Sequence, residues 1–245
     1  MKKTILTALL LFAAAAVFAQ SEYNFQRRSL FEKLPVTSKD IVFLGNSITD
    51  GGEWNELLAN PRVKNRGISG DRSGWLLERL DPIIEGHPKK LFLMIGINDL
   101  ISGASPDEVL ANIGRLIDRF QAESRWTKIY VQSILPVNGV DLPGYERRKA
   151  YAPLIVPTNK RLEALCDCLH GDFCRRAEGT ESAVLFESTM RGGMMFGFTG
   201  NYIRVKAPYE RAFINRICRV RLGTMDGTHD LAGEIVRDNG ETERL

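Results

Sequence analysis

The chain has 245 residues, of which 44% are hydrophobic and 26% charged, and its formal net charge at pH 7 is +3. This composition is typical of an ordinary soluble protein and excludes a chain that is mostly disordered. The net charge is too small to indicate a polyanion partner for the whole chain. The length is sufficient for one α/β domain and a small second domain.

The first 19 residues have the features of an export signal. Met1–Lys3 supplies a basic start, Ile5–Phe18 is apolar, and Val17–Ala19 forms a small-residue cleavage pattern before Gln20. These features predict a Sec signal peptide over residues 1–19 and a periplasmic or secreted protein. Because the apolar run is shorter than the roughly 20 residues that span a bilayer, we expect no stable membrane span after cleavage.

The segment from residue 20 to residue 168 alternates between strand and helix patterns. This alternation predicts right-handed βαβ units and a parallel sheet, so the expected fold class is α/β. Ser105 is expected to cap the helix that begins at Pro106. The expected strands are Ile41–Leu44, Leu91–Ile95 and Lys128–Ser133, and the expected helices are Gly74–Ile84, Pro106–Gln121 and Pro153–Cys168.

Three polar, glycine-bearing islands follow strand-like runs in this segment. They are Phe43–Thr49, which contains Ser47, then Asn65–Asp71, and Ile95–Asp99. Open α/β sheets bind ligands at the edge where their strands end, and a nucleophile must be reachable by substrate and by a base. Any one island is also typical of an ordinary strand-to-helix turn. Three in succession favour a catalytic edge.

The residue types in the islands suit ester hydrolysis. Ser47 is the candidate nucleophile, and the backbone N–H groups of Ser47 and Gly70 with the side-chain amide of Asn98 are candidate donors to the developing oxyanion. Gly70 suits a backbone that must approach substrate closely, because no Cβ intrudes. The loop from Leu135 to Tyr145, rich in Pro, Gly, Asn and Asp, is a further candidate for the substrate cleft.

From about residue 25 to about residue 168, the three islands resemble the first three blocks of the SGNH (GDSL-type) hydrolases, within the bacterial branch that includes carbohydrate acetylesterases. Asn46 stands where the older family name has an aspartate. The resemblance implies a flavodoxin-like three-layer α/β fold. It also implies removal of short acyl groups such as acetyl from a carbohydrate or similar small ester, with no metal or organic cofactor.

The same resemblance implies a histidine base preceded three residues earlier by an orienting aspartate. Asp226 and His229 match that pattern. They also lie between two strand-like runs and contain the turn dipeptide Asp-Gly, so a hairpin-loop histidine is an equal interpretation. His87 precedes a proline and is expected at the surface, and His170 has no aspartate at the right spacing.

Residues 169–245 have a different character. Short β-type runs separated by glycine-rich turns predict a small antiparallel β-barrel. Residues 179–237 resemble the TRAM domain of radical-SAM tRNA methylthiotransferases, notably in Gly197–Lys206, and this resemblance implies RNA binding. The expected runs are Ala183–Glu187, Gly192–Val205 and Asn215–Leu222.

The chemistry of this second part is compatible with RNA. Phe196, Phe198 and Tyr202 lie among basic residues, a mixture that combines base stacking with phosphate attraction. Core aromatics and a solvated arginine face are an equally good interpretation. The chain lacks the three-cysteine cluster motif of an iron–sulfur centre, which excludes methylthiolation. Cys174 and Cys218 are candidates for a disulfide or for free buried thiols, and the cysteine spacing indicates no zinc site.

An export signal and a tRNA-binding domain are hard to reconcile in one chain. We therefore expect a fused or truncated reading frame, with residues 20–168 a truncated hydrolase domain and residues 169–245 an unrelated barrel. The main prediction is an exported serine ester hydrolase that acts on a small-molecule or glycan ester. The alternatives are an inactive fusion with a tRNA-binding barrel, and a hydrolase-fold protein that binds acylated glycans without turnover.

Overall fold

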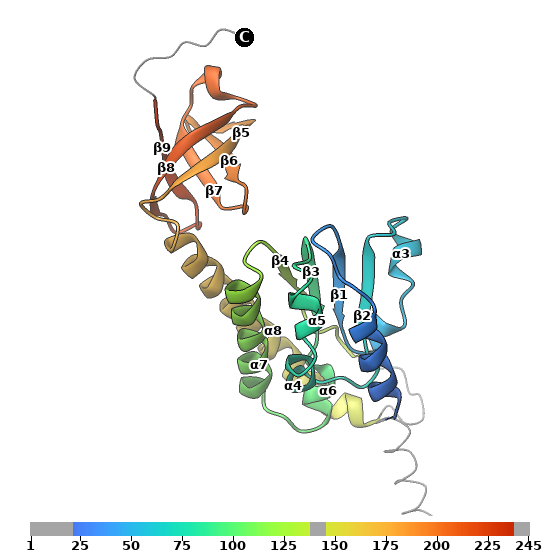
Figure 1. The fold of residues 1–245 in the computed structure, drawn as a ribbon. Helices are drawn as coiled ribbons and strands as arrows, with labels where there is room; N and C mark the ends of the chain where they lie inside the picture. The colour runs from blue at the N-terminus through green and yellow to red at the C-terminus, as the bar shows by residue number, and fades with distance from the viewer. Residues whose placement is uncertain (1–21, 138–145, 238–245) are drawn as a thin grey trace, which may run out of the picture. The chain divides into compact units, whose positions relative to one another are not determined.

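The computed structural model describes residues 22–137 and 146–237. The chain divides into two compact units, Met1–Glu163 and Ala164–Leu245, an α/β unit and a barrel (Figure 1). The predicted signal peptide and most of the predicted cleft loop lie outside the described residues. Among the helices that the structure describes, none combines the length and apolarity needed to cross a bilayer.

The α/β unit contains a four-stranded sheet in the order β2-β1-β3-β4. All three pairings are parallel, which confirms the predicted parallel sheet. The two central strands are apolar runs that bury alternate side chains completely, because one face of the sheet forms part of the core. The strands are β1 (Ile41–Gly45), β2 (Val63–Gly67), β3 (Lys90–Met94) and β4 (Lys128–Val131).

Strand β2 extends into the second polar island, so Asn65 and Gly67 belong to a strand rather than to a loop. The side-chain amide of Asn65 explains how a polar residue is accommodated here. Its Nδ2 donates to the main-chain oxygens of Thr49, Asp50 and Gly52 at 2.8, 3.1 and 3.0 Å. The polar side chain of β2 therefore ties down the segment that follows β1.

The opposite face of the sheet carries a row of stacked rings. Phe43 stacks on Phe92, and Phe92 stacks on Tyr130, with ring centroids 4.9 and 4.8 Å apart, while Trp54 of α3 (Trp54–Leu57) stacks on Phe43 at 5.1 Å. Strand register places these rings side by side. Phe43 and Phe92 are half-buried, and Tyr130 is 41% exposed. No layer of the described residues therefore covers these rings completely.

The helices agree with the predictions in part. The expected helix Gly74–Ile84 is wrong as one element, because Pro82 lies in the first turn of a separate helix and has no N–H to continue the earlier one. The expected start at Pro153 is also wrong, since that helix begins at Glu146. The helices are residues 22–33, α2 (Ser47–Asp50), α3 (Trp54–Leu57), α4 (Ser73–Leu77), α5 (Asp81–Ile84), α6 (Ile97–Ile101), α7 (Pro106–Glu123) and α8 (Glu146–Arg175).

The second unit is a closed five-stranded barrel in the order β5-β6-β7-β9-β8. The prediction of a wholly antiparallel barrel is wrong, because β7 and β9 pair in parallel. The reason is topological: five strands cannot alternate in direction around a closed ring, so one pair must be parallel. The strands are β5 (Glu181–Arg191), β6 (Met194–Thr199), β7 (Arg204–Pro208), β8 (Ile217–Met225) and β9 (Leu231–Ile235), and a short 3₁₀ helix covers Arg211–Phe213.

The barrel encloses its own hydrophobic core. Phe186, Val205 and Leu231 are completely buried in it, and the last turns of α8 add Cys174. Cys218 packs against the same core, and both cysteines are free thiols. Of the two alternatives for this pair, the structure therefore shows free thiols.

The cap of α7 provides a test of the fold. Ser105 Oγ accepts a hydrogen bond from Glu108 N at 3.2 Å, as the sequence predicts. Loss of an N-cap hydroxyl typically costs about 1 kcal/mol, so we expect Ser105→Ala to lower the free energy of unfolding by about that amount. All three tryptophans lie in the α/β unit, so urea denaturation followed by tryptophan fluorescence reports on it.

Ser38→Ala is the matched control, because Ser38 is exposed and makes no hydrogen bond within the described residues. Equal unfolding free energies for the two variants would show that the cap contributes nothing.

Candidate active site

Ser47 is the first residue of α2, and only Asn46 separates it from the end of β1. Asn46 caps this helix, its Oδ1 accepting a hydrogen bond from Ile48 N at 3.1 Å. Ser47 is exposed, and its Oγ has no hydrogen-bond partner in the part of the chain that the structure describes. Glycine is required at position 45, where a Cβ would lie 2.5 Å from Met94 O and 2.3 Å from Thr49 Oγ1. The turn therefore presents an unbonded hydroxyl at the sheet edge.

Gly70 lies in the loop after β2 and has a φ of 85°, a conformation that favours glycine. Its N–H has no acceptor among the described residues, although the groups on both sides of it are bonded. Gly70 is thus a donor available to a ligand.

Asn98 lies in the first turn of α6, after β3. Its Nδ2 donates to Asp71 O at 2.9 Å, which joins the third island directly to the second. An amide nitrogen carries two hydrogens, so one remains for another acceptor. In the sheet register Gly45 is opposite both Gly67 and Met94, and the structure therefore brings Ser47, Gly70 and Asn98 to one edge.

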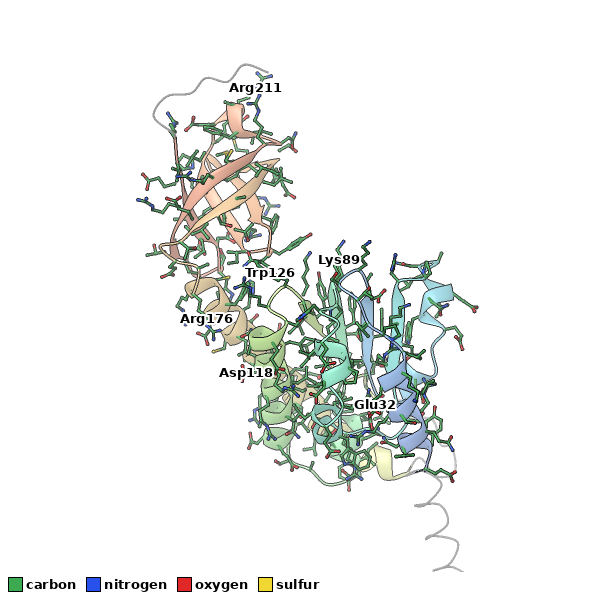
Figure 2. The ribbon with its side chains drawn as sticks, viewed as in Figure 1. Glu32, Lys89, Asp118, Trp126, Arg176 and Arg211 are labelled. Carbon is green, nitrogen blue, oxygen red and sulfur yellow. The ribbon has the colours of Figure 1, made fainter. Side chains whose placement is uncertain are left out.

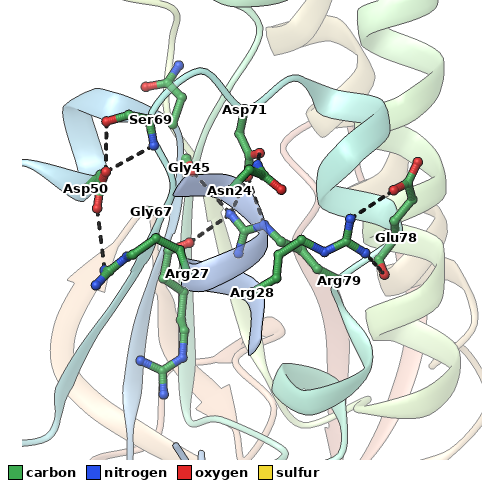
Figure 3. A network of polar contacts seen from close by, with 12 residues as sticks. Asn24, Arg27, Arg28, Gly45, Asp50, Gly67, Ser69, Asp71, Glu78 and Arg79 are labelled. Carbon is green, nitrogen blue, oxygen red and sulfur yellow. Dashed lines mark hydrogen bonds and ion pairs between the residues drawn. The ribbon is translucent and has the colours of Figure 1, made fainter. Parts of the chain in front are cut away.

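A polar network that the sequence analysis missed supports this edge (Figure 3). Asp71 is completely buried and forms an ion pair with Arg79, whose Nη2 lies 2.7 Å from Oδ2. The same Nη2 donates to Arg66 O at 2.9 Å and to Gly45 O at 3.3 Å. Burial raises the pKa of the Asp71 carboxyl, and the Arg79 guanidinium opposes that rise. Asp71 and Arg79 lie on either side of α4 (Ser73–Leu77), and their Asp-x₇-Arg spacing was the available sequence signal.

A second buried carboxylate, Asp99, holds the start of α4. It accepts hydrogen bonds from Ser73 N at 3.0 Å and from Ser73 Oγ at 2.6 Å, and Asn112 of α7 donates to that same hydroxyl at 2.8 Å. Burial raises the pKa of Asp99. Among the described residues, no group of His, Cys, Asp and Glu side chains has an arrangement that could hold a metal ion.

The candidate base and its orienter lie in the barrel unit, in the turn between β8 and β9, so the predicted hairpin is confirmed. The Asp226 carboxylate accepts hydrogen bonds from Lys206 Nζ, from Thr228 N and Oγ1 and from Asp230 N, and the hydrogen bond from Lys206 is the first cause of its lowered pKa. The His229 ring lies edge-on to His170, with centroids 5.5 Å apart. The bonds of Asp226 are thus those of a turn residue.

His87 is the one histidine of the α/β unit, and it lies at the wrong edge. It precedes β3, two residues before Lys89, which is labelled in Figure 2. Ser47 follows the carboxyl end of β1, whereas His87 is at the amino ends of the parallel strands. His87 is exposed, as predicted, and its Nδ1 lies 3.2 Å from Ser124 Oγ.

The buried ion pair gives the second prediction. In Arg79→Leu the Asp71 carboxyl loses its partner, and breaking a buried pair typically costs about 3–5 kcal/mol of stability. Arg28→Leu is the control, because the Arg28–Glu78 pair is largely exposed and such pairs contribute about 0–1 kcal/mol. Urea denaturation followed by tryptophan fluorescence measures both. A loss for Arg79→Leu no larger than that of the control would contradict a supporting role for the buried pair.

Comparisons with solved structures found similar chains. One is a Streptococcus pneumonia protein provisionally described as a platelet activating factor, with 29% identity over 66% of this chain and 76% of that one, and a TM-score of 0.55. Another is a GDSL-like lipase from Bacteroides thetaiotaomicron, with 25% identity over 60% of this chain and 74% of that one, and a TM-score of 0.50. A comparison with curated proteins found no match.

The comparisons support a family for the α/β unit but not for the barrel as a whole. None of these findings supports the likeness of residues 179–237 to a TRAM domain, which stays a prediction. The model of the GDSL-like Lipase/Acylhydrolase family matches residues 43–184, more than half of the chain, including Ser47, Gly70 and Asn98. The chain therefore belongs to the GDSL-like lipase/acylhydrolase family, a membership that indicates a carboxylic ester hydrolase.

Proposed function

We propose that the protein is an exported serine esterase that removes short acyl groups, such as acetyl, from a carbohydrate or similar small ester. The observation that carries the proposal is the edge of the sheet where the unbonded Ser47 hydroxyl lies with the Gly70 N–H, which has no acceptor in the described residues, and the second hydrogen of Asn98 Nδ2. The choice of acetyl rests on the likeness of the three islands to the acetylesterase branch. Export rests on the sequence of residues 1–19.

In this mechanism Ser47 Oγ attacks the ester carbonyl, the alcohol leaves, and water then releases the acyl group from the serine. The negative charge that develops on the carbonyl oxygen is held by the N–H groups of Ser47 and Gly70 and by the second hydrogen of Asn98 Nδ2. The N–H of Ser47 is at the first position of a helix, where no intrahelical acceptor exists. Each such donor contributes typically about 10²–10³ in rate.

His229 as the base and Asp226 as its orienter are predictions that mutagenesis decides. The Asp226 carboxylate is bonded to Lys206, Thr228 and Asp230. Separate substitutions of Asp226 and His229 therefore test the two roles independently. If His229 is the base, we expect His229→Ala to lower kcat by orders of magnitude and Asp226→Ala to lower it less. His170→Ala is the matched control from the same ring pair.

The test is hydrolysis of 4-nitrophenyl acetate by the purified protein. We expect Ser47→Ala to abolish the serine-dependent rate and Asn98→Ala to lower kcat by about 10²–10³. Ser38→Ala, which changes an exposed serine without hydrogen bonds in the described residues, should match the wild type. A Ser47→Ala rate equal to that of the wild type would overturn the proposed function.

A second candidate function, RNA binding, is favoured by the outer surface of the barrel. Phe196 and Phe198 alternate with buried residues along β6, so they face outward, and β7 places Lys206 and Arg204 opposite them. The Arg204 guanidinium lies over the Phe196 ring at 5.7 Å. Rings beside basic groups suit stacked bases and phosphates. RNA would compete here with the ion pairs that Arg204 and Lys206 make to aspartates of the turn between β8 and β9.

The binding of a fluorescein-labelled single-stranded RNA to the full chain tests this candidate. We expect binding that weakens as salt rises, and a loss of about tenfold in Phe198→Ala, since stacking of one base is worth about 1–3 kcal/mol. Phe25→Ala is the control, because Phe25 is an exposed aromatic of the other unit. No binding at low salt would remove RNA as a ligand.

A further inference from the structure

The helix of residues 22–33 reaches two carboxylates that flank the candidate oxyanion loop (Figure 3). Tyr23 OH donates to Asp50 Oδ2 at 2.6 Å, and Asn24 Nδ2 donates to Asp71 Oδ1 at 2.8 Å. Arg27 Nη2 lies 3.4 Å from Asp50 Oδ1. Neighbouring side chains of one helix therefore bind both carboxylates.

Asp50 joins the segment of the nucleophile to the segment of the glycine donor. It is the last residue of α2, the helix that Ser47 begins. Its Oδ2 accepts hydrogen bonds from Ser69 N at 3.0 Å and from Ser69 Oγ at 2.8 Å, and Ser69 directly precedes Gly70. The Asp50 side chain is 8% exposed, so water competes little for these bonds.

Asp71 holds the other side of Gly70. Its side chain is bound by Arg79 and Asn24, and its main-chain oxygen accepts the hydrogen bond from Asn98. The chain is thus fixed immediately before and after Gly70, while the N–H of Gly70 itself stays without an acceptor in the described part of the chain. A donor held in this way needs no rearrangement when charge develops on a bound ester.

We propose that the helix of residues 22–33 positions the oxyanion hole, with Tyr23 and Asn24 as positioning residues that hold Asp50 and Asp71. This inference rests on the proposed function. The helix touches no reacting atom and acts through the two carboxylates. The hydrogen bond to Asp50 is the first cause of a raised pKa for Tyr23, so the hydroxyl stays protonated and remains a donor.

Arg27 contributes to the same arrangement by packing. Its guanidinium lies over the Phe31 ring at 4.6 Å, and the guanidinium of Arg66 lies over the same ring at 4.9 Å. Phe31 is buried, which anchors the helix against the α/β unit. Removal of the Tyr23 hydroxyl or the Asn24 amide therefore leaves the helix in place while it takes one hydrogen bond away from Asp50 or Asp71.

The test compares Tyr23→Phe, Asn24→Ala and the double variant in the full chain, with 4-nitrophenyl acetate as substrate. A displacement of about 1 Å at a reacting centre can cost up to about 10²-fold in rate, so we expect the double variant to lose at least about tenfold in kcat with KM changed less than about twofold. Gln26→Ala is the control and should leave kcat unchanged, because within the described residues the Gln26 side chain bonds only Glu22 of the same helix.

Thermal unfolding of each variant separates positioning from stability. A kcat within about twofold of the wild type, or a fall in kcat matched by Gln26→Ala, would overturn the inference. A change in KM alone would also overturn it, since that would place the helix contacts in substrate binding. Ser47→Ala distinguishes the two proposals: if it changes nothing the proposed function fails, whereas if it abolishes turnover and the helix variants do not, only this inference fails.

Discussion

The ion pair between Asp71 and Arg79 is the interaction on which the candidate site depends. Its two side chains are 0% and 5% exposed, so neither charge has water as an alternative partner. Through Arg79 it reaches the main-chain oxygens of Gly45 and Arg66 in β1 and β2. Through Asp71 it reaches Asn98, which follows β3. One buried pair therefore fixes the ends of three strands relative to one another.

Two polar groups at this edge have no hydrogen-bond partner among the described residues, although the chain around them is well bonded. Asp50 and Asp71 hold the residues on either side of Gly70, and Asn46 holds the turn that carries Ser47. Nevertheless, the hydroxyl of Ser47 and the N–H of Gly70 have no partners in the described residues. Ser47 is exposed and Gly70 is half-buried, so an incoming ligand can reach both groups at one edge of a well-bonded network.

The two units differ in chemistry as well as in topology. The α/β unit carries the serine and the donors, and its one histidine lies at the opposite edge of the sheet. The barrel carries the other two histidines beside each other, and the Asp226 carboxylate forms part of a turn. His229 is therefore the histidine whose substitution is most informative about turnover.

The sequence by itself determined the parallel sheet, the Ser105 cap, the position of the three polar islands after strands and the hairpin around His229. Each of these depends on local signals: apolar runs, capping residues, and glycine or asparagine at turns. Only the tertiary structure decided the parallel β7–β9 pair and the network of Tyr23, Asn24, Asp50, Asp71 and Arg79. These features depend on ring closure and on contacts between residues as many as 47 positions apart. Local patterns carry no information on such pairings, because burial and register arise only when the strands come together.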